Sequence, residues 1–333
     1  MNPKSAARIT ALGTYVPERL LLNDDLEKLV DTSDAWIVQR TGIHERHIAA
    51  DDEFTSHLCV RAVENLRGPG CETVGLEDVD LIIASTTTPD YSFPTVSCRI
   101  QKHFGMEDAG AVDLNATCAG FTYALHMANG MITSGLHRKI LVVAGETMSK
   151  ITDYTDRSTC ILFGDGAGAA LVEYAPDQPG FESAIMGTQG SGGIHVYRSG
   201  LSAEMDGQPL AGEGRIVQNG REVFKWAVRT VSAGIEKLLE QAQLTVDDID
   251  WFVPHSANLR MIESICEKSG IPLAKTLQSV TEMGNTSSAS IPLALQAGVR
   301  AGQLNPGDRV LLYGFGSGLT HCGLLIRWGV TPN

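Results

Sequence analysis

A polar turn joins an apolar strand to a helix of small residues at Asp113-Leu114-Asn115-Ala116-Thr117-Cys118-Ala119-Gly120-Phe121. A second turn of the same kind occurs at Thr281-Glu282-Met283-Gly284-Asn285-Thr286-Ser287-Ser288. Before each turn a strand opens at an acidic residue, Asp80 or Asp250, and after each turn a strand opens at a basic residue, Lys139 or Arg309. The similar order and spacing predict two copies of one structural unit.

Short apolar runs bounded by turns predict the buried strands. They lie at residues 80–84, 139–144, 169–172, 250–254 and 309–313, and helices are expected at 121–131, 221–242 and 291–299. This alternation is typical of an α/β layered fold. We assign residues 1–175 to an N-terminal half and residues 176–333 to a C-terminal half, related by pseudo-twofold symmetry. A glycine-rich segment at 187–220 is placed between them as a lid, a binding loop or a linker.

The composition narrows the class of protein. The chain has 333 residues and a formal net charge of −13, which disfavours binding to nucleic acid or to an anionic membrane. The seven cysteines are odd in number and form no C-x-x-C pair, so they indicate neither a zinc site nor a disulfide framework. We see no secretory signal and no apolar run of the roughly 20 residues that a membrane helix needs. We therefore expect a cytoplasmic protein without a metal.

Cys118 is the strongest candidate for a nucleophile. It stands at the start of a helix, where the macrodipole is expected to lower the pKa of the thiol and to raise the fraction of thiolate. Unpaired backbone N–H groups at the same place can stabilise an oxyanion. The alternative is a buried structural cysteine, which we prefer for the other six cysteines.

His255 and Asn285 are the candidate partners of that thiol. His255 follows an apolar strand that ends at Pro254, and ligand sites in α/β sheets gather at the carboxyl ends of strands. Our alignment of the two halves sets Asn285 opposite Thr117 and sets Thr286 opposite Cys118. Alone, the histidine could be a core residue and the asparagine a helix cap. Together with the cysteine, they favour a Cys/His/Asn site.

A fourth segment, at residues 313–320, ends a strand in a glycine-dense turn. Glycine permits backbone conformations that direct N–H groups toward a ligand, so the backbone of Ser317 is a candidate oxyanion-hole donor. The glycines at 164–168 lack the G-x-G-x-x-G spacing, and a strand is expected after them. We therefore reject a dinucleotide site there.

These motifs resemble those of the β-ketoacyl-[acyl carrier protein] synthase III family, which has a thiolase-like fold. The resemblance extends from about residue 9 to residue 328 and includes two further stretches, at 31–38 and 40–43. It implies a duplicated, five-layered αβαβα core. It also implies a homodimer that initiates type II fatty-acid synthesis by condensing an acyl-CoA primer with malonyl-acyl carrier protein.

The resemblance assigns roles to single residues. It makes Cys118 the acyl-accepting nucleophile and makes His255 and Asn285 the pair that supports decarboxylation. It implies coenzyme A contacts from Thr32, Trp36, Arg40, Arg157 and Asn258, with the adenine between Trp36 and Arg157. It also implies that Phe93 reaches the partner subunit's acyl pocket and that Lys225 and Arg260 face the carrier protein. Many relatives have Gln where Ser256 stands and Gly where Ser317 stands.

The implied chemistry needs only these side chains and backbone groups. Cys118 takes the acyl group from the coenzyme A thioester, which is a substrate, and no metal or redox cofactor is expected. Loss of CO₂ from the malonyl unit leaves an enolate, to which neutral His255 and the Asn285 amide can donate hydrogen bonds. The enolate carbon then attacks the acyl-cysteine and gives 3-oxoacyl-acyl carrier protein.

Several alternatives remain at this point. A starter-unit ketosynthase of secondary metabolism would share every residue above, and straight, branched and longer primers all stay open. A degradative thiolase would need a second catalytic cysteine near residues 315–318, and an HMG-CoA synthase would need a catalytic glutamate. A papain-like hydrolase would lack the duplicated layout. The last alternative is a binding module without catalysis.

Overall fold

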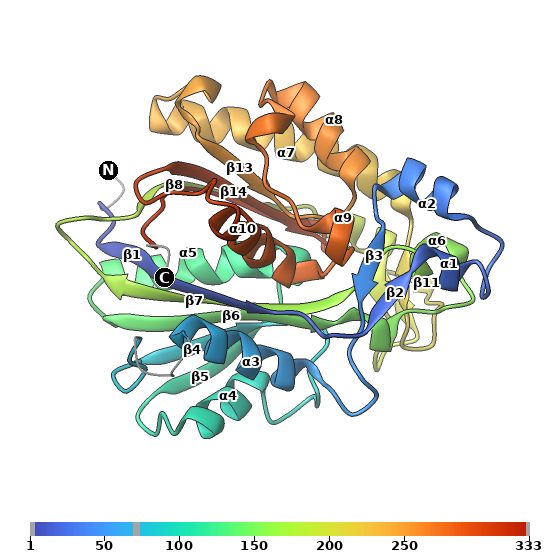
Figure 1. Cartoon of the computed structure of the whole chain (residues 1–333), viewed down its shortest axis with the longest axis horizontal. Coiled ribbons are helices and arrows are strands. Elements are labelled where there is room, and N and C mark those ends of the chain that lie inside the picture. The colour runs from blue at the N-terminus through green and yellow to red at the C-terminus, as the bar shows by residue number, and fades with distance from the viewer. Residues whose placement is uncertain (1–3, 69–73, 331–333) are drawn as a thin grey trace.

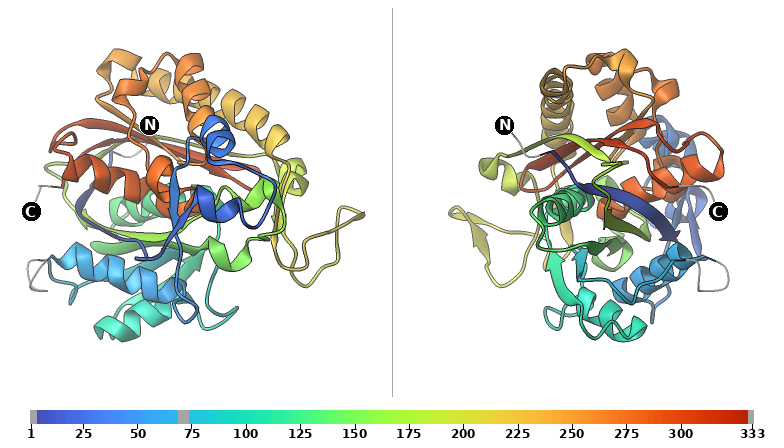
Figure 2. Two further views of the ribbon diagram at one scale, coloured as in Figure 1. Left: turned by 45° about the vertical axis from the view of Figure 1, so that its right-hand side comes forward. Right: turned by 90° about the vertical axis from the view of Figure 1, so that its left-hand side faces the viewer.

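The computed structural model describes residues 4–68 and 74–330, and Cys71 lies outside the described residues. Two β-sheets alternate with three layers of helices, which gives the five layers αβαβα expected from the sequence (Figure 1). The same layers are visible from the side in Figure 2. The predicted α/β, thiolase-like architecture is confirmed.

The first sheet is formed entirely by the N-terminal part of the chain. Its strands are, in spatial order, β1 (Ala7–Tyr15), β7 (Asp165–Tyr174), β6 (Lys139–Thr147), β4 (Leu81–Ser85) and β5 (Gly110–Leu114). β4 runs parallel to β5 and β6, whereas β7 runs antiparallel to β6 and β1. Every residue of β6 is buried, as the apolar run from residue 139 predicts.

The second sheet repeats this arrangement with one strand fewer. Its strands are, in spatial order, β13 (Trp251–Pro254), β14 (Arg309–Gly316), β15 (Thr320–Arg327) and β8 (Phe181–Thr188). β13 and β14 are parallel, and the other neighbours are antiparallel. Because β8 pairs with β15, the glycine-rich segment that begins at residue 187 lies inside the part of the chain that forms this sheet.

Two helices occupy each helical layer. α5 (Gly120–Thr133) and α10 (Ser290–Arg300) lie between the sheets, α3 (Thr55–Arg67) and α4 (Val96–Phe104) cover the first sheet, and α7 (Gly220–Ala242) and α8 (Leu259–Ser269) cover the second (Figure 1). The three helices predicted from the sequence are therefore present, within one or two residues of the expected ends.

Short elements connect these layers. The glycine-rich segment is partly ordered as strands, and its hairpin of β10 and β11 projects from the body of the molecule in Figure 2. The short strands and helices are β2 (Leu20–Leu22), α1 (Asn23–Leu26), α2 (Asp34–Thr41), β3 (Glu45–His47), α6 (Arg157–Cys160), β9 (Val196–Arg198), β10 (Glu204–Met205), β11 (Gln208–Pro209), β12 (Ile216–Gln218) and α9 (Val280–Met283). The 3₁₀ helices are η1 (Thr117–Ala119), η2 (Met148–Ile151), η3 (Gly190–His195), η4 (Val246–Asp248), η5 (Leu273–Lys275) and η6 (Ser287–Ala289).

The two polar turns are duplicates, but their register differs from our alignment. Thr117 and Ser287 both have a left-handed backbone, with φ of 49° and 51°. The Asn115 side chain accepts a hydrogen bond from the Thr117 N–H at 3.2 Å, and Asn285 accepts one from the Ser287 N–H at 2.9 Å. Asn285 therefore corresponds to Asn115, not to Thr117, and Ser288 takes the place of Cys118. The alignment was two residues out.

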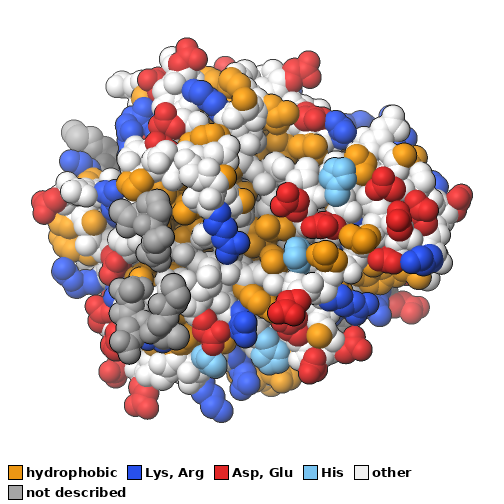
Figure 3. Space-filling model, viewed as in Figure 1, with side chains coloured by type: hydrophobic (Ala, Val, Ile, Leu, Met, Phe, Trp, Pro, Cys, Tyr) orange, Lys and Arg blue, Asp and Glu red, His pale blue; other side chains and the backbone are white. Residues whose placement is uncertain are grey.

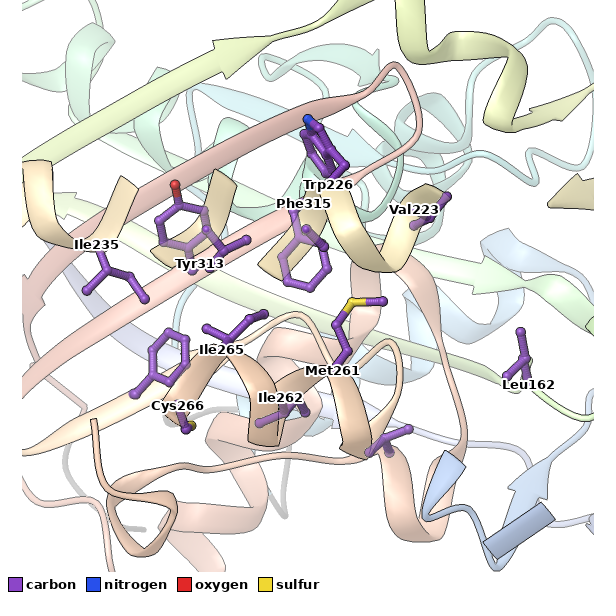
Figure 4. Packing of buried hydrophobic residues seen from close by; sticks show 14 of the residues in the cluster. Leu162, Val223, Trp226, Ile235, Met261, Ile262, Ile265, Cys266, Tyr313 and Phe315 are labelled. Carbon is purple, nitrogen blue, oxygen red and sulfur yellow. The ribbon is translucent and has the colours of Figure 1, made fainter. Parts of the chain in front are cut away.

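A large apolar cluster holds α7 and α8 on the second sheet (Figure 4). Trp226, Met261 and Phe315 belong to it, one each from α7, α8 and β14. Burying a large apolar side chain contributes about 1.5–3 kcal/mol, so this interface fixes the end of β14 firmly. That end borders the candidate site.

The surface mixes both signs of charge despite the net charge of −13. Acidic and basic side chains are interspersed on the face shown in Figure 3. Within residues 4–68 and 74–330, none of the helices is both long enough and apolar enough to span a bilayer.

Candidate active site

A cavity of about 1180 Å³ opens between the two halves of the molecule. Cys118, His255 and Asn285 all line it, so three residues far apart in the sequence meet at one place. They come from the 3₁₀ helix η1, from the end of β13 and from the turn before η6. The convergence that the sequence predicts is present.

Cys118 lies in the turn between β5 and α5 and is half-buried. The preceding residue, Thr117, has a positive φ of 49°, which is uncommon for a residue other than glycine and is often found at functional sites. The end of β14 approaches closely, because a Cβ atom at Gly316 would lie only 2.9 Å from the Cys118 Cβ atom. Glycine at 316 thus allows the glycine-dense turn to border the sulfur.

The pKa of the Cys118 thiol differs from our expectation. The helix start was expected to lower it, but burial, together with the nearby carboxyl of Glu146, raises the pKa to about 12. The Ser287 side chain acts in the opposite direction. The prediction of a lowered pKa was wrong because it considered the local helix end and not the desolvation around it.

His255 is buried and fixed on two sides. Its Nδ1 atom lies 2.7 Å from the Ser290 hydroxyl oxygen, and its ring meets the Phe315 ring edge-on at 5.1 Å. Burial lowers the pKa of His255 to about 3, and a hydrogen bond with the Ser287 backbone opposes this shift. The imidazole is therefore neutral at pH 7 and has one N–H donor.

Asn285 is held by its backbone and by one side-chain atom. Its N–H donates to the Leu162 carbonyl at 2.8 Å, and its own carbonyl accepts from the Gly164 N–H at 3.1 Å. The side-chain oxygen accepts from the Ser287 N–H at 2.9 Å. This leaves the amide NH₂ as the group that Asn285 can offer to a ligand in the cavity.

Ser317 lies at the cavity wall. Its hydroxyl donates to the Val196 carbonyl at 2.5 Å, and its backbone carbonyl accepts from the Thr117 hydroxyl at 3.2 Å. A serine in place of the glycine of many relatives is thus accommodated by a hydrogen bond to β9.

The residues expected to contact coenzyme A lie in and near one stretch of the cavity rim. Trp36, Arg40 and Asn258 line the cavity, whereas Thr32 and Arg157 do not. The Arg157 guanidinium lies over the Trp36 ring, 4.9 Å from its centroid, and Arg40 lies 5.7 Å from the same ring. A planar base stacked between the two groups would set the guanidinium about 7 Å from the ring. Trp36 and Arg157 must therefore move apart to admit a base.

Comparison with known proteins agrees with this geometry. Family models described as 3-oxoacyl-[acyl-carrier-protein (ACP)] synthase III match residues 112–190, and residues 239–328 match the C-terminal model. The β-ketoacyl-[acyl-carrier-protein] synthase III 2 of Bacillus subtilis is 62% identical over 98% of this chain and 100% of its own. The solved synthase III of Thermus thermophilus is 46% identical with a TM-score of 0.91, covering 97% of this chain and 99% of its own.

The chain belongs to the β-ketoacyl-[acyl carrier protein] synthase III family. It is a condensing acyltransferase of fatty-acid synthesis. The solved priming β-ketosynthase of the R1128 polyketide pathway is 36% identical, with a TM-score of 0.91 over 100% of this chain and 99% of its own. The alternative from secondary metabolism is not favoured, because this identity is well below the 62% shared with the Bacillus subtilis synthase.

In this synthase III, the two basic residues expected at the carrier surface are already paired. The Lys225 Nζ atom lies 2.9 Å from Glu222, and the Arg260 guanidinium lies 2.8 Å from Glu263. Exposed pairs of this kind contribute little stability, so a stronger anionic partner can displace them. Phe93 does not line this cavity, and 84% of it is exposed.

The sequence analysis missed three polar residues around the synthase site. Ser290 bonds to His255. Ser287 donates to Glu146, which raises the pKa of the thiol from a fully buried position on β6. One available signal was overlooked, since Glu146 is a lone acidic residue two positions after the apolar run 139–144.

The other described cysteines divide into two groups. Cys59, Cys160, Cys266 and Cys322 are buried free thiols, as expected for structural cysteines. Cys98 is exposed at the start of α4, where the Thr95 hydroxyl contacts its sulfur at 3.0 Å. The prediction of a buried residue was therefore wrong for Cys98.

Proposed function

We propose that Cys118, His255 and Asn285 catalyse the decarboxylative condensation of an acyl-CoA primer with malonyl-acyl carrier protein. The products are 3-oxoacyl-acyl carrier protein, coenzyme A and CO₂. The observation that supports these roles is the meeting of the three side chains in one cavity. The reaction needs no cofactor beyond the thioester substrates, because a nucleophile and hydrogen-bond donors suffice.

The first step is transfer of the acyl group to the sulfur. Because the thiol is protonated at pH 7, its proton leaves as the sulfur attacks the thioester carbonyl and passes to the departing coenzyme A thiolate. The tetrahedral oxyanion is stabilised by the backbone N–H groups of Cys118 and Ser317. The glycine-dense turn approaches Cys118 closely at Gly316, which supports the use of both N–H groups on one oxyanion.

The second step begins with loss of CO₂ from the malonyl unit. Negative charge then develops on the thioester oxygen, and it is stabilised by the His255 N–H and the Asn285 amide. A neutral imidazole suits this role, because it donates a hydrogen bond without the cost of holding a charge in a buried site. The carbanion attacks the acyl-cysteine carbonyl, and Cys118 leaves as a thiolate that takes up a proton from water.

The rim of the cavity is proposed to bind the coenzyme A of one substrate and the acyl carrier protein of the other. Trp36 and Arg157 hold the adenine, with Thr32 and Arg40 near the nucleotide and Asn258 near the pantetheine arm. The π-face and the guanidinium suit a planar base, and their present contact shows that the two groups can stack. Lys225 and Arg260 bind the acidic carrier protein.

We further propose a cytoplasmic homodimer. The edge strand β5 and the nearby loop support this, since Val112 is 43% exposed and Phe93 is 84% exposed. Uncovered edges and apolar side chains are usually protected by a partner. In such a dimer, Phe93 enters the partner's acyl pocket. The six free thiols of the described residues suit a reducing compartment.

Incubation with radiolabelled acetyl-CoA tests the role of the sulfur. The wild-type chain should retain the label after denaturation, whereas Cys118→Ser should not. His255→Ala and Asn285→Ala should still be labelled but should lose decarboxylation of malonyl-acyl carrier protein. Labelling of Cys118→Ser to the wild-type level would refute the assignment.

Charge reversal tests the carrier surface. Lys225→Glu together with Arg260→Glu should raise the KM for malonyl-acyl carrier protein and should leave labelling by acetyl-CoA unchanged. An equal loss of both steps would show that these two residues act on the fold and not on the carrier protein.

A further inference from the structure

The hydroxyl group of Thr117 connects the turn that carries the nucleophile to the other half of the molecule. Its Oγ1 atom donates a hydrogen bond to the Ser317 carbonyl at 3.2 Å. Thr117 belongs to η1 in the N-terminal half, whereas Ser317 directly follows β14 in the C-terminal half. Ser317 is also the residue whose backbone N–H is proposed to stabilise the oxyanion, so the contact bears directly on that donor.

The backbone at Thr117 has a conformation that a β-branched residue seldom adopts. Its φ of 49° lies in the left-handed region, where such residues are outliers. A conformation of this kind persists only where the surroundings hold it, and it is common at functional sites. Here the Asn115 side chain accepts a hydrogen bond from the Thr117 N–H at 3.2 Å, and the Thr117 hydroxyl is bound to Ser317. The turn is therefore fixed at both its backbone and its side chain.

The duplicated turn makes the equivalent contact in the opposite direction. Ser287, which corresponds to Thr117 and has a φ of 51°, donates its hydroxyl to Glu146 at 3.1 Å. Glu146 stands near the end of β6, the strand that corresponds to β14. In both turns the left-handed residue thus uses its hydroxyl to reach the end of the matching strand in the other half. The copy at Thr117 is the one that reaches a proposed oxyanion donor.

Ser317 lies in the turn between β14 and β15, beyond the last residue pair of the two strands. Three contacts fix this turn. The Ser317 hydroxyl donates to the Val196 carbonyl at 2.5 Å, Leu319 and Gln189 exchange two backbone hydrogen bonds of 2.8 and 3.0 Å, and the Thr117 hydroxyl binds the Ser317 carbonyl. Of these three contacts, only that of Thr117 comes from the segment that carries the sulfur. It therefore sets the place of the Ser317 backbone relative to the nucleophile.

We propose that Thr117 is a positioning residue for acyl transfer, whose hydroxyl holds the Ser317 backbone so that its N–H is directed at the oxyanion. The inference rests on the proposed acylation of Cys118 and deepens it. Donors in an oxyanion hole are effective because they are fixed before the charge develops. Without the Thr117 hydroxyl, the Ser317 N–H is still present, but the turn that carries it is no longer held against the segment of the nucleophile.

Thr117→Val and Thr117→Ser separate the role of the hydroxyl from that of the methyl group. Valine keeps the β-branched shape and has no donor, whereas serine keeps the donor. The readout is the single-turnover rate at which radiolabelled acetyl-CoA acylates Cys118. We expect Thr117→Val to be about tenfold slower, the effect of one lost hydrogen bond, with an unchanged half-saturating concentration of acetyl-CoA. Thr117→Ser should recover most of the wild-type rate.

A second reagent shows whether the thiol itself has changed. Methyl methanethiosulfonate transfers a methylthio group to the sulfur and has no carbonyl, so no tetrahedral oxyanion forms. Mass spectrometry of the peptide that contains Cys118 should show that Thr117→Val reacts with this reagent at the wild-type rate. The matched control Thr133→Val removes a hydroxyl that donates to Asn129 at the end of α5, and it should match the wild type in both reactions.

Each result decides for or against this role of Thr117. Acylation of Thr117→Val at the wild-type rate would overturn the inference, and so would equal losses with both reagents or a Thr117→Ser variant as slow as Thr117→Val. If Thr117→Val does not fold, Thr117→Ala decides by the same criteria, because it removes the same hydroxyl and is less strained at a positive φ. Absence of label in the wild type would refute the acylation of Cys118 itself, and the inference with it.

Discussion

The Nδ1 atom of His255 lies 2.7 Å from the Ser290 hydroxyl oxygen, at the point where α10 begins. The same oxygen accepts a hydrogen bond from the Ser256 N–H at 3.2 Å. The Ser290 hydroxyl can donate its own proton to Nδ1, and in that arrangement the imidazole proton lies on Nε2. Ser290 thus fixes the orientation of the histidine ring.

Ser290→Ala should therefore slow decarboxylation without affecting the acyl transfer. Losing one hydrogen bond of about 1.4 kcal/mol corresponds to about a tenfold lower rate of CO₂ release from malonyl-acyl carrier protein. Labelling by radiolabelled acetyl-CoA serves as the internal control and should stay within twofold of the wild type. Parallel losses in both steps would contradict a role confined to His255.

The low pKa of His255 predicts a defined acid dependence of stability. The unfolded histidine takes up a proton below pH 6.5, while the folded one stays neutral down to about pH 3. Its folded pKa is depressed, so stability is present above pH 6.5 and is lost as the pH falls from 6.5 toward 3. Between pH 7 and pH 5 this one group should cost about 2 kcal/mol of unfolding free energy.

Urea unfolding at pH 7 and pH 5 checks this value in the wild type and in His255→Asn. The variant should lose about 2 kcal/mol less on acidification than the wild type does. The same pKa predicts that the rate of decarboxylation is flat between pH 5.5 and 8. A kinetic midpoint near 6.5 in that profile would show that the histidine titrates normally.

The meeting of Cys118, His255 and Asn285 in one site could be predicted from the sequence, because each stands at a strand end or turn with a recognisable local pattern. Local pattern is what a sequence shows directly. Glu146 stands out locally as a lone acidic residue beside an apolar run, but its contact with Ser287 could not be predicted, because it joins residues 141 positions apart. The raised pKa of Cys118 was missed for the same reason, since desolvation depends on what packs around a group.

The architecture and the register of the duplicated turns were both predictable from the spacing of strands and turns. The interval from Asn115 to the strand that opens at Lys139 equals the interval from Asn285 to the strand that opens at Arg309. Our alignment was two residues out because it matched the acidic start of one turn, Asp113, with Thr281 and did not hold this interval constant. The paired backbone angles at Thr117 and Ser287 show the correct correspondence.

The contact between Arg157 and Trp36 predicts a selective effect on coenzyme A. Trp36→Ala removes the ring over which the guanidinium lies 4.9 Å from the centroid. A cation–π or stacking contact contributes about 1 kcal/mol, so the KM for acetyl-CoA should rise about fivefold. The KM for malonyl-acyl carrier protein, which has no adenine, should not change in the same preparation. A rise in both would indicate that Trp36 supports the fold of α2 and not the nucleotide.

The approach of Gly316 to the sulfur predicts that one methyl group at this position blocks acylation. A Cβ atom there would lie 2.7 Å from the Thr117 Oγ1 atom, 2.9 Å from the Cys118 Cβ atom and 3.0 Å from the Cys118 nitrogen. The two Cys118 atoms cannot move without displacing the nucleophile or the proposed oxyanion donor. Gly316→Ala should therefore lower the rate of labelling by acetyl-CoA by about a hundredfold, the loss expected when an oxyanion donor is misplaced.

Gly130→Ala is the matched control, because a Cβ atom at Gly130 in α5 meets nothing within 4 Å. It should label at the wild-type rate and should unfold at the same or a higher temperature, since alanine favours a helix over glycine by about 1 kcal/mol. If Gly316→Ala labels as fast as this control, the turn does not border the reacting carbonyl. The oxyanion would then have to be stabilised by Cys118 without the backbone of Ser317.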